Sequence, residues 1–365
     1  NKYLKRFNSS LLILQGDPEK LILDLVQKKN VSALYSNLDY EPYAIERDMK
    51  ITNSLKKYNT QHLQFKDQVI FGPKEILKDD GNPYTVYTPY KNKWLTKFEK
   101  SLISVNTSLL NNNFSKEIFD FPDLKEIGFV DSKIKVSDYS LNILGSYKDF
   151  RDFPALDKTS YLSVHLRFGT VSIREIVKLI AGSDSVFLSE LIWREFFMQI
   201  LYNFPHVAFN SFKTKYDKIV WRNNKDEFKL WCEGKTGYPI VDSGMRQLNE
   251  TGYMHNRVRM IVAGFLCKHL LVDWRWGEKY FSQKLLDYEM SSNNGNWQWA
   301  AGTGCDSAPY FRIFNPFTQQ KKFDKDYSYV KKWIKNFDEN NYLDYIVDHK
   351  FARKRALDCY KLYLS

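Results

Sequence analysis

Hydrophobic positions in the first part of the chain occur in short runs separated by more polar segments. The runs have the length of buried strands, and the intervening segments 18–29 and 43–58 are predicted as helices. Strands that alternate with helices are typical of a parallel α/β sheet, which we predict for residues 1–95. The three predicted strands contain Leu11–Leu14, Ala33–Tyr35 and Val69–Phe71.

The pattern changes to the spacing of amphipathic helices beyond Tyr147. Ile192, Phe196 and Ile200 recur every four residues, and apolar residues from Val258 to Leu266 follow the template of a buried helix face. We therefore predict a mostly helical domain over residues 144–365. The polar, Asn- and Ser-rich segment 96–143 is predicted to be a linker. The chain begins at Asn1 and not at a methionine, so we expect the α/β domain to be incomplete at its N-terminus.

Composition limits the class of protein. The 365 residues are 43% hydrophobic but contain no run of about 18 apolar residues, so we expect neither a membrane span nor a signal peptide. The four cysteines lie at least 35 residues apart, without a CxxC pair or a Cys/His cluster. This spacing predicts no metal site and favours a reducing compartment, the cytoplasm.

Charge and aromatic content widen the functional possibilities. The net charge of +11 suits a protein that binds nucleic acid, although the same excess can serve solubility alone. Aromatic residues make up 16% of the chain, and eight of the nine tryptophans lie in its C-terminal half. They form either a large aromatic core or a platform for flat ligands such as a flavin or nucleobases.

A phosphate site is one interpretation of the hydroxyl-rich segment Thr159–Ser163. No glycine-rich nucleotide loop of the G-x-G-x-x-G or G-x-x-x-x-G-K-[ST] type occurs. The hydroxyls of Thr159, Ser160 and Ser163 come just before a predicted helix, where free N–H groups favour an anion. A plain helix cap explains the same residues.

Two further segments combine charged and aromatic side chains. Glu190 and Arg194 are one helical turn apart beside Trp193, which indicates either a surface ion pair or a carboxyl group that binds a base edge next to a stacking wall. Arg257 and Arg259 begin a strongly apolar helix, so one can reach DNA phosphate while the other turns inward to a carboxylate. His255 is interpreted as a structural histidine.

The segment 287–299 is the most specific stretch of the chain. Acid, amide and indole groups are concentrated in thirteen residues, Asp287 to Trp299. Local packing rarely requires such a mixture, although a structural loop remains an alternative.

Together these motifs resemble the photolyase/cryptochrome family. The resemblance implies an N-terminal α/β domain and a C-terminal helical domain that binds FAD in a bent shape. It is carried by Trp231–Pro239, Met254–Arg257, Asn293–Trp299 and Pro309–Pro316.

The resemblance also implies which residues contact FAD. The phosphate and ribityl contacts would be Tyr147, Thr159, Ser160, Leu162 and Ser163. Asn293 would face the reactive flavin nitrogen, and Arg259 would pair with Asp287. The contacts around the flavin would be Phe187, Arg259, Asp287, Tyr288, Glu289 and Asn293.

Two more sets of residues follow from the resemblance. Trp221, Trp274 and Trp297 would relay electrons from the surface to the flavin. Trp193 and Trp299 would be the walls of a pocket for a flipped-out dimer. The DNA-binding set would be Arg151, Glu190, Trp193, Arg194, Phe197, Asn256, Arg257, Trp299 and Gln319.

The implied activity is repair of cyclobutane pyrimidine dimers in DNA by light-driven electron transfer from reduced FAD, with Glu190 and Asn293 stabilising the charge that develops. A damaged pair is flipped out at the lowest cost, which gives selectivity without sequence readout. A cryptochrome-type photoreceptor and a (6-4) photoproduct photolyase are the alternatives. Asn293, the Glu190/Trp193 pair and the absence of a long tail after Ser365 speak against the first. Asn256, where (6-4) enzymes usually carry a second histidine, speaks against the second.

The remaining expectations concern the antenna and the assembly. An antenna chromophore would be methenyltetrahydrofolate or a deazaflavin, with Glu41 as the one candidate contact. We expect a monomer in the bacterial cytosol.

Overall fold

The computed structural model describes residues 1–99, 113–182 and 184–364. These residues form two compact units. Unit 1 contains residues 1–68 and 99–135, and unit 2 contains residues 69–98 and 136–365. The units are defined by compactness alone, so the predicted division into functional domains over 1–95, 96–143 and 144–365 stays a prediction.

Unit 1 is built around a parallel βαβ arrangement. Strand β1 (Ala33–Asn37) pairs with β2 (Gln61–Phe65), and Tyr35 lies opposite Leu63. Helix α2 (Pro42–Leu55), extended by the 3-10 turn η2 (Lys56–Tyr58), connects the two strands. Helix α1 (Pro18–Lys29) precedes β1, and the short 3-10 turn η1 (Leu4–Phe7) lies near the N-terminus. This arrangement confirms the predicted parallel α/β class.

Local signals explain where α1 begins and ends. The Asp17 carboxylate accepts a hydrogen bond from the Lys20 amide, and Pro18 occupies the first helical position, where its missing N–H costs nothing. Asn30 ends the helix in the left-handed conformation at φ 52°. The helix then buries Val26 against Ile51 and Leu55 of α2.

Two of the three predicted strands are corrected by the structure. Leu11–Leu14 forms no strand, and Leu11 and Leu14 are each nearly half exposed, because no neighbouring strand offers them a ladder of hydrogen bonds. Val69–Phe71 is also irregular. Its amide groups at Ile70 and Phe71 donate to the carboxylate of Glu195.

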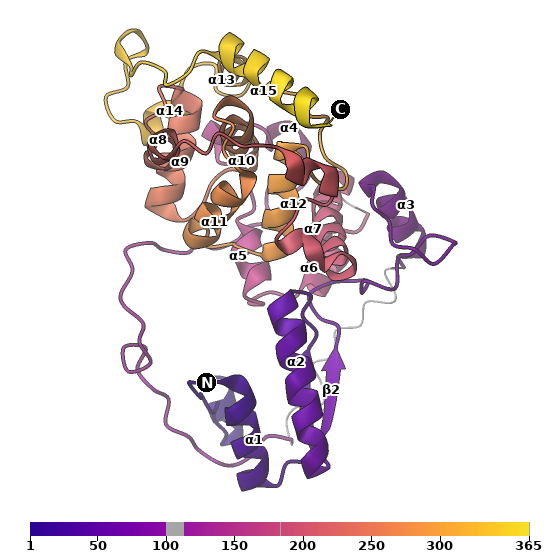
Figure 1. Ribbon diagram of the computed structural model, residues 1–365. Coiled ribbons are helices and arrows are strands. Elements are labelled where there is room, and N and C mark those ends of the chain that lie inside the picture. Colours follow the sequence, from indigo (N-terminus) through magenta and orange to yellow (C-terminus); the bar gives the residue numbers. More distant parts are fainter. Residues whose placement is uncertain (100–112, 183, 365) are drawn as a thin grey trace. The chain divides into compact units, whose positions relative to one another are not determined.

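The described part of unit 2 is almost entirely helical (Figure 1). The α-helices that begin before residue 230 are α3 (Tyr87–Lys97), α4 (Tyr147–Phe150), α5 (Leu162–Arg167), α6 (Ile173–Ile180), α7 (Ser185–Asn203) and α8 (Lys225–Glu233). The later ones are α9 (Pro239–Thr251), α10 (Asn256–Gly264), α11 (Trp274–Lys284), α12 (Met290–Ala301), α13 (Pro316–Phe323), α14 (Ser328–Trp333) and α15 (His349–Leu364). Shorter turns are η4 (Pro154–Leu156), η5 (Pro205–Ala208), η6 (Thr214–Lys218), η8 (Glu339–Asn341) and the π-helical turn η7 (Phe265–His269).

The core of unit 2 lies where α9, α10, α11 and α12 meet. Trp231, Val258, Val262, Leu266 and Trp274 are among its fully buried members. Close approach between α9 and α10 depends on Gly244, since a Cβ there would lie 2.4 Å from a methyl group of Val258. This packing confirms the predicted helical C-terminal part. Among the described residues, no helix combines the length and the apolar content needed to cross a membrane.

Side-chain caps determine where the helices of the later site begin. Asp184 accepts hydrogen bonds from Val186 N and Phe187 N at the start of α7. The His255 ring accepts from Arg257 N at the start of α10, as expected of a structural histidine. Glu289 caps α12 in the same way.

Candidate functional site

Three adjoining cavities in unit 2 form one continuous cleft, because Asn256, Arg259 and Asp287 line all of them. We call the largest, of about 490 Å³, the main lobe. The hydroxyl lobe is about 210 Å³, and the inner lobe is about 100 Å³. The combined space is in the range of sites that hold a large cofactor or ligand.

The hydroxyl lobe is lined by the segment that the sequence marked as a possible phosphate site. Thr159, Ser160 and Ser163 all border it. The Ser160 hydroxyl also accepts a 3.3 Å hydrogen bond from Leu162 N, the first residue of α5, although the N-cap residue is Tyr161. Tyr161 is held in the left-handed conformation at φ 54°, which turns the chain into α5. The Thr159 hydroxyl lies 3.2 Å from the hydroxyl of Tyr253, which fixes the segment to the wall of the lobe.

A partly buried ion pair lies where the three lobes meet. The Arg259 guanidinium donates to Asp287 Oδ2 at 2.8 Å and to the carbonyl of Met254 at 2.8 Å. Burial by itself would lower the pKa of Arg259. The charge and hydrogen bond of Asp287 outweigh this effect and raise the pKa above its ordinary value. This confirms the predicted Arg259–Asp287 pair. The other carboxylate oxygen of Asp287, Oδ1, is buried without a hydrogen-bond partner.

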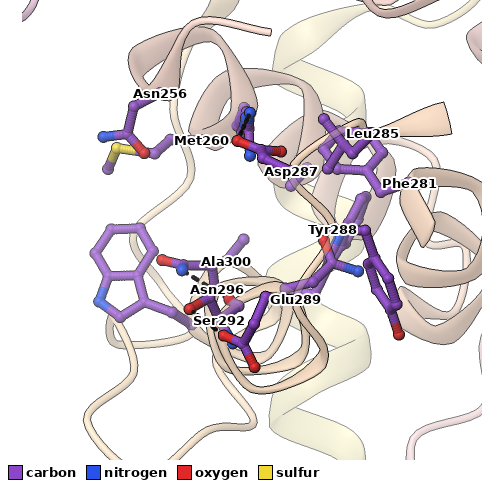
Figure 2. Close-up of a pocket in the computed structure, with 15 residues that line it drawn as sticks. Asn256, Met260, Phe281, Leu285, Asp287, Tyr288, Glu289, Ser292, Asn296 and Ala300 are labelled. Atoms are coloured by element: carbon purple, nitrogen blue, oxygen red, sulfur yellow. Dashed lines mark hydrogen bonds and ion pairs between the residues drawn. The ribbon is translucent and has the colours of Figure 1, made fainter. Parts of the chain in front are cut away.

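The inner lobe lies between α10 and α12. Figure 2 shows Asn256, Met260 and Asp287 on one side of the open space and Ser292 and Asn296 on the other. Asn293 also borders this lobe. Its side-chain amide donates to the Glu278 carboxylate at 2.8 Å, and burial raises the pKa of Glu278.

Glu289 uses both of its oxygens to begin α12. One accepts from the amide and hydroxyl of Ser291 at 2.8 and 2.6 Å, and the other from those of Ser292 at 3.0 and 2.7 Å. The side chain also borders the cleft. Its first function in the structure is thus to place the helix that carries Asn293, Trp297 and Trp299.

The wall of the main lobe combines ion pairs with aromatic rings. Arg151 and Glu190 form an ion pair at 2.7 Å that bridges α7 and the end of α4. Arg257 pairs with Asp152 at 2.8 Å, and its guanidinium carbon lies 4.5 Å from the centre of the Phe323 ring. Trp193, Phe197 and Trp299 add flat apolar surface. The carboxyl group beside Trp193 is therefore held by Arg151, from a different helix.

Most of the predicted site residues converge on this cleft. The lining includes Tyr147, Arg151, Thr159, Ser160, Leu162, Ser163, Phe187, Glu190, Trp193, Arg194, Phe197, Asn256, Arg257, Arg259, Asp287, Tyr288, Glu289, Asn293, Trp297 and Trp299. Trp221, Trp274 and Gln319 do not line these three cavities.

Other lining residues were missed by the sequence analysis. Met260 follows Asn256 by one helical turn, and Ser292 and Asn296 are one turn apart on the face of α12 that continues to Ala300. Helical spacing from the predicted residues was the signal that could have found them. Tyr161 and Tyr253 border the hydroxyl lobe, and only their folded position brings them there.

Comparison with known proteins identifies the family. The profile of the "FAD binding domain of DNA photolyase" matches residues 187–341, and that of "DNA photolyase" matches residues 1–107. The chain is 37% identical over 359 residues to deoxyribodipyrimidine photo-lyase of Synechococcus sp., covering 89% of this chain and 74% of the relative. It is 36% identical over 387 residues to the protein of the same name from Escherichia coli, covering 94% and 81%. The chain belongs to the DNA photolyase family.

Solved structures of photolyases have the same fold. A class III photolyase from Agrobacterium tumefaciens matches with a TM-score of 0.87 at 32% identity, covering 99% of this chain and 86% of the other. An archaeal photolyase from Sulfolobus tokodaii, described with two FAD molecules, matches with a TM-score of 0.82 at 34% identity, covering 99% and 85%. The sequence resemblance to the photolyase/cryptochrome family is thus confirmed.

The cleft fits the FAD that this family binds. The matched FAD-binding domain contains the ion pair Arg259–Asp287 and all of α12. The partnerless, buried Asp287 Oδ1 calls for a hydrogen-bond donor from a ligand, and both the ring system and the sugar chain of FAD carry such donors. The hydroxyls of Thr159 and Ser163 suit further polar groups of the cofactor in the hydroxyl lobe.

Proposed function

We propose that the chain repairs cyclobutane pyrimidine dimers in DNA with light, as a deoxyribodipyrimidine photo-lyase that uses FAD. One observation carries the proposal. A single cleft joins an inner part around Asp287 to an outer wall in which the Arg151–Glu190 ion pair stands beside Trp193 and Trp299. Such a cleft can hold a flavin and leave room for a flipped-out lesion next to it.

The outer wall suits a pyrimidine dimer that is flipped out of the duplex. Trp193 and Trp299 offer rings for stacking, which contributes roughly 1–3 kcal/mol per base. Glu190 offers a carboxyl group to a base edge, and Arg151 holds that group in position and balances its charge. We propose that Arg257, which lines the main lobe, contacts a phosphate. The remaining DNA contacts that we propose are Arg194, Phe197, Asn256 and Gln319.

The inner wall would hold FAD through Asp287, Asn293 and the other predicted contacts. FAD supplies the light-driven electron transfer when it is bound. Asp287 Oδ1 can accept a hydrogen bond from the cofactor while Oδ2 pairs with Arg259. Asn293 is fixed by Glu278, so its amide has a defined orientation at the lobe.

We further propose that Trp297, Trp274 and Trp221 relay electrons towards the flavin. Trp297 is buried and packs on Gly277, one turn after Trp274 on α11. Trp274 is fully buried, and Trp221 packs at the edge of the same core. In the proposed series Trp297 borders the inner lobe and Trp221 is the half-buried member.

The finer expectations are proposals of the same kind. We propose that the protein acts on DNA as a monomer in the bacterial cytosol, for which its four free thiols are suited. Methenyltetrahydrofolate or a deazaflavin remains the proposed antenna. Glu41, the candidate contact, lies at the N-cap of α2 in unit 1.

A direct repair assay tests the proposal. Reduced protein is illuminated with an oligonucleotide that contains one thymine dimer, and the return of thymine absorbance is followed. Light-dependent recovery supports repair of cyclobutane dimers. Bound flavin without recovery would instead favour the cryptochrome-type photoreceptor, and recovery only with a (6-4) substrate would favour the other alternative.

A further inference from the structure

The helix α3 carries an aromatic stripe that packs against α7. Tyr87, Tyr90 and Trp94 follow the i, i+3, i+7 spacing of one helix face, and all three are buried. Tyr90 contacts Phe196 with ring centres 5.3 Å apart. The stripe lies outside the matched FAD-binding domain, and Tyr87 does not line the three cavities of the cleft.

Tyr87 is held at three points and lies flat on Trp193. Its ring centre is 3.6 Å from that of Trp193, and the planes differ by 8°. The Tyr87 hydroxyl donates to the Ser189 carbonyl at 2.7 Å, and its backbone N–H donates to Asp306 Oδ2 at 3.0 Å. The tyrosine ring is therefore fixed independently of the indole on which it lies.

A buried carboxylate fixes the rest of α3 to the same helix. Glu195, two residues after Trp193, accepts hydrogen bonds from Trp94 Nε1 at 2.6 Å and from Ile70 N and Phe71 N at 2.7 and 3.0 Å. These contacts prevent α3 from sliding along α7. The register between Tyr87 and Trp193 is thus set by groups that do not touch the cleft.

We propose that Tyr87 is a positioning residue for the lesion pocket, because it covers one face of Trp193 and holds the indole plane ready for a base. The inference rests on the proposed function. An indole that has already lost its torsional freedom in the folded protein costs less to order when a ligand binds. Trp193 is partly buried and also contacts Phe196 and Phe197, with ring centres 5.6 and 5.4 Å away, but Tyr87 at 3.6 Å is the ring that lies nearest and flattest against it.

The test compares variants that keep or remove the ring on Trp193. Tyr87→Phe keeps the stacked ring and loses only the bond to Ser189, whereas Tyr87→Leu and Tyr87→Met remove the ring. Tyr90→Leu is the control, since it removes a buried aromatic ring of the same helix that contacts Phe196. It also removes a long hydrogen bond of 3.4 Å from the Tyr90 hydroxyl to Glu195, but the shorter bonds of Glu195 to Trp94, Ile70 and Phe71 remain. Each variant is measured for flavin content, for Kd on a duplex with one thymine dimer, and for Kd on the same duplex without it.

The Leu and Met variants should bind the dimer duplex roughly three- to tenfold more weakly, the equivalent of one aromatic pair. Their affinity for undamaged duplex should be unchanged, because phosphate contacts do not depend on Trp193. Tyr87→Phe and Tyr90→Leu should keep the wild-type preference for the dimer.

Three results would overturn the inference. The first is a wild-type preference for the dimer duplex in Tyr87→Leu or Tyr87→Met. The second is a loss of dimer affinity in Tyr90→Leu equal to that in Tyr87→Leu. The third is the same loss of dimer affinity in Tyr87→Phe. If the Leu and Met variants lose their flavin or fail to fold, the Phe variant decides alone. A retained preference for the dimer duplex would then support the inference, and a lost preference would contradict it. A wild-type protein without any preference for the dimer would instead refute the proposed function.

Discussion

The pH dependence of folding should reveal the buried imidazole of His255. This ring is 3% exposed, and burial lowers its pKa to about 4. Its Nδ1 accepts the hydrogen bond from Arg257 N that caps α10, so a proton on Nδ1 would place a donor against a donor. Asp152 acts in the opposite direction and favours protonation, Arg259 and Arg257 together oppose it, and burial is the largest effect, so the pKa stays lowered.

The sign and size follow from linkage. An unfolded histidine binds a proton near pH 6.5, whereas the folded one stays neutral to about pH 4, so stability is lost as the pH falls through this window. Between pH 7.5 and pH 5 the loss from this one group is about 2 kcal/mol. The variant His255→Asn keeps an oxygen that can cap the helix and has no proton to take up. The stability of the wild type relative to this variant should therefore fall by about 2 kcal/mol over that interval.

Urea unfolding followed by tryptophan fluorescence measures this difference. All nine tryptophans belong to unit 2, so the signal reports on the unit that contains His255. His206→Asn, the same substitution at an exposed position of unit 2, is the control. A pH-independent difference for His255→Asn would refute the reasoning, because the ring would then titrate alike in both states.

Three further changes probe the cleft itself. Asp287→Asn should lower the free energy of unfolding by about 2–3 kcal/mol, since Arg259 loses its counter-charge. It should also reduce the amount of flavin that each protein retains on gel filtration. An unchanged flavin content would count against Asp287 as a cofactor ligand. Arg257→Ala should weaken the binding of damaged and undamaged duplex alike, and should make the slope of log K against log salt concentration shallower by about one. An unaltered slope would rule out a phosphate contact. Trp297→Phe should abolish photoreduction of oxidised flavin and spare repair by flavin reduced chemically, whereas loss of both would contradict a relay.

How far the fold could be predicted depended on how local each signal was. The helix 18–29 was predicted with the bounds that the structure has, because Asp17, Pro18 and Asn30 mark its ends in the sequence itself. The strand predicted at Leu11–Leu14 was wrong, since an apolar run becomes a strand only if another strand pairs with it, and the run does not indicate whether one will.

The site showed the same limit. Most residues named from the motif positions line the cleft, and helical spacing would have added Met260 and Asn296. The partner of Glu190 could not be read from its helix, because Arg151 is 39 residues away and reaches it only through the fold. The stacking of Tyr87 on Trp193 is likewise a product of tertiary packing.

The two acids before α12 show why residue type and position alone do not assign a role. Both were predicted as flavin contacts, yet the longer side chain of Glu289 reaches the amides and hydroxyls of Ser291 and Ser292, and four hydrogen bonds occupy its oxygens. Asp287 gives one oxygen to Arg259 and leaves the other without a partner at the junction of the lobes. An unsatisfied buried acceptor costs about 1–3 kcal/mol, which a bound donor can recover. Of the two, Asp287 therefore has the stronger physical reason to bind the cofactor, and Glu289 acts by fixing the start of the helix that carries Asn293.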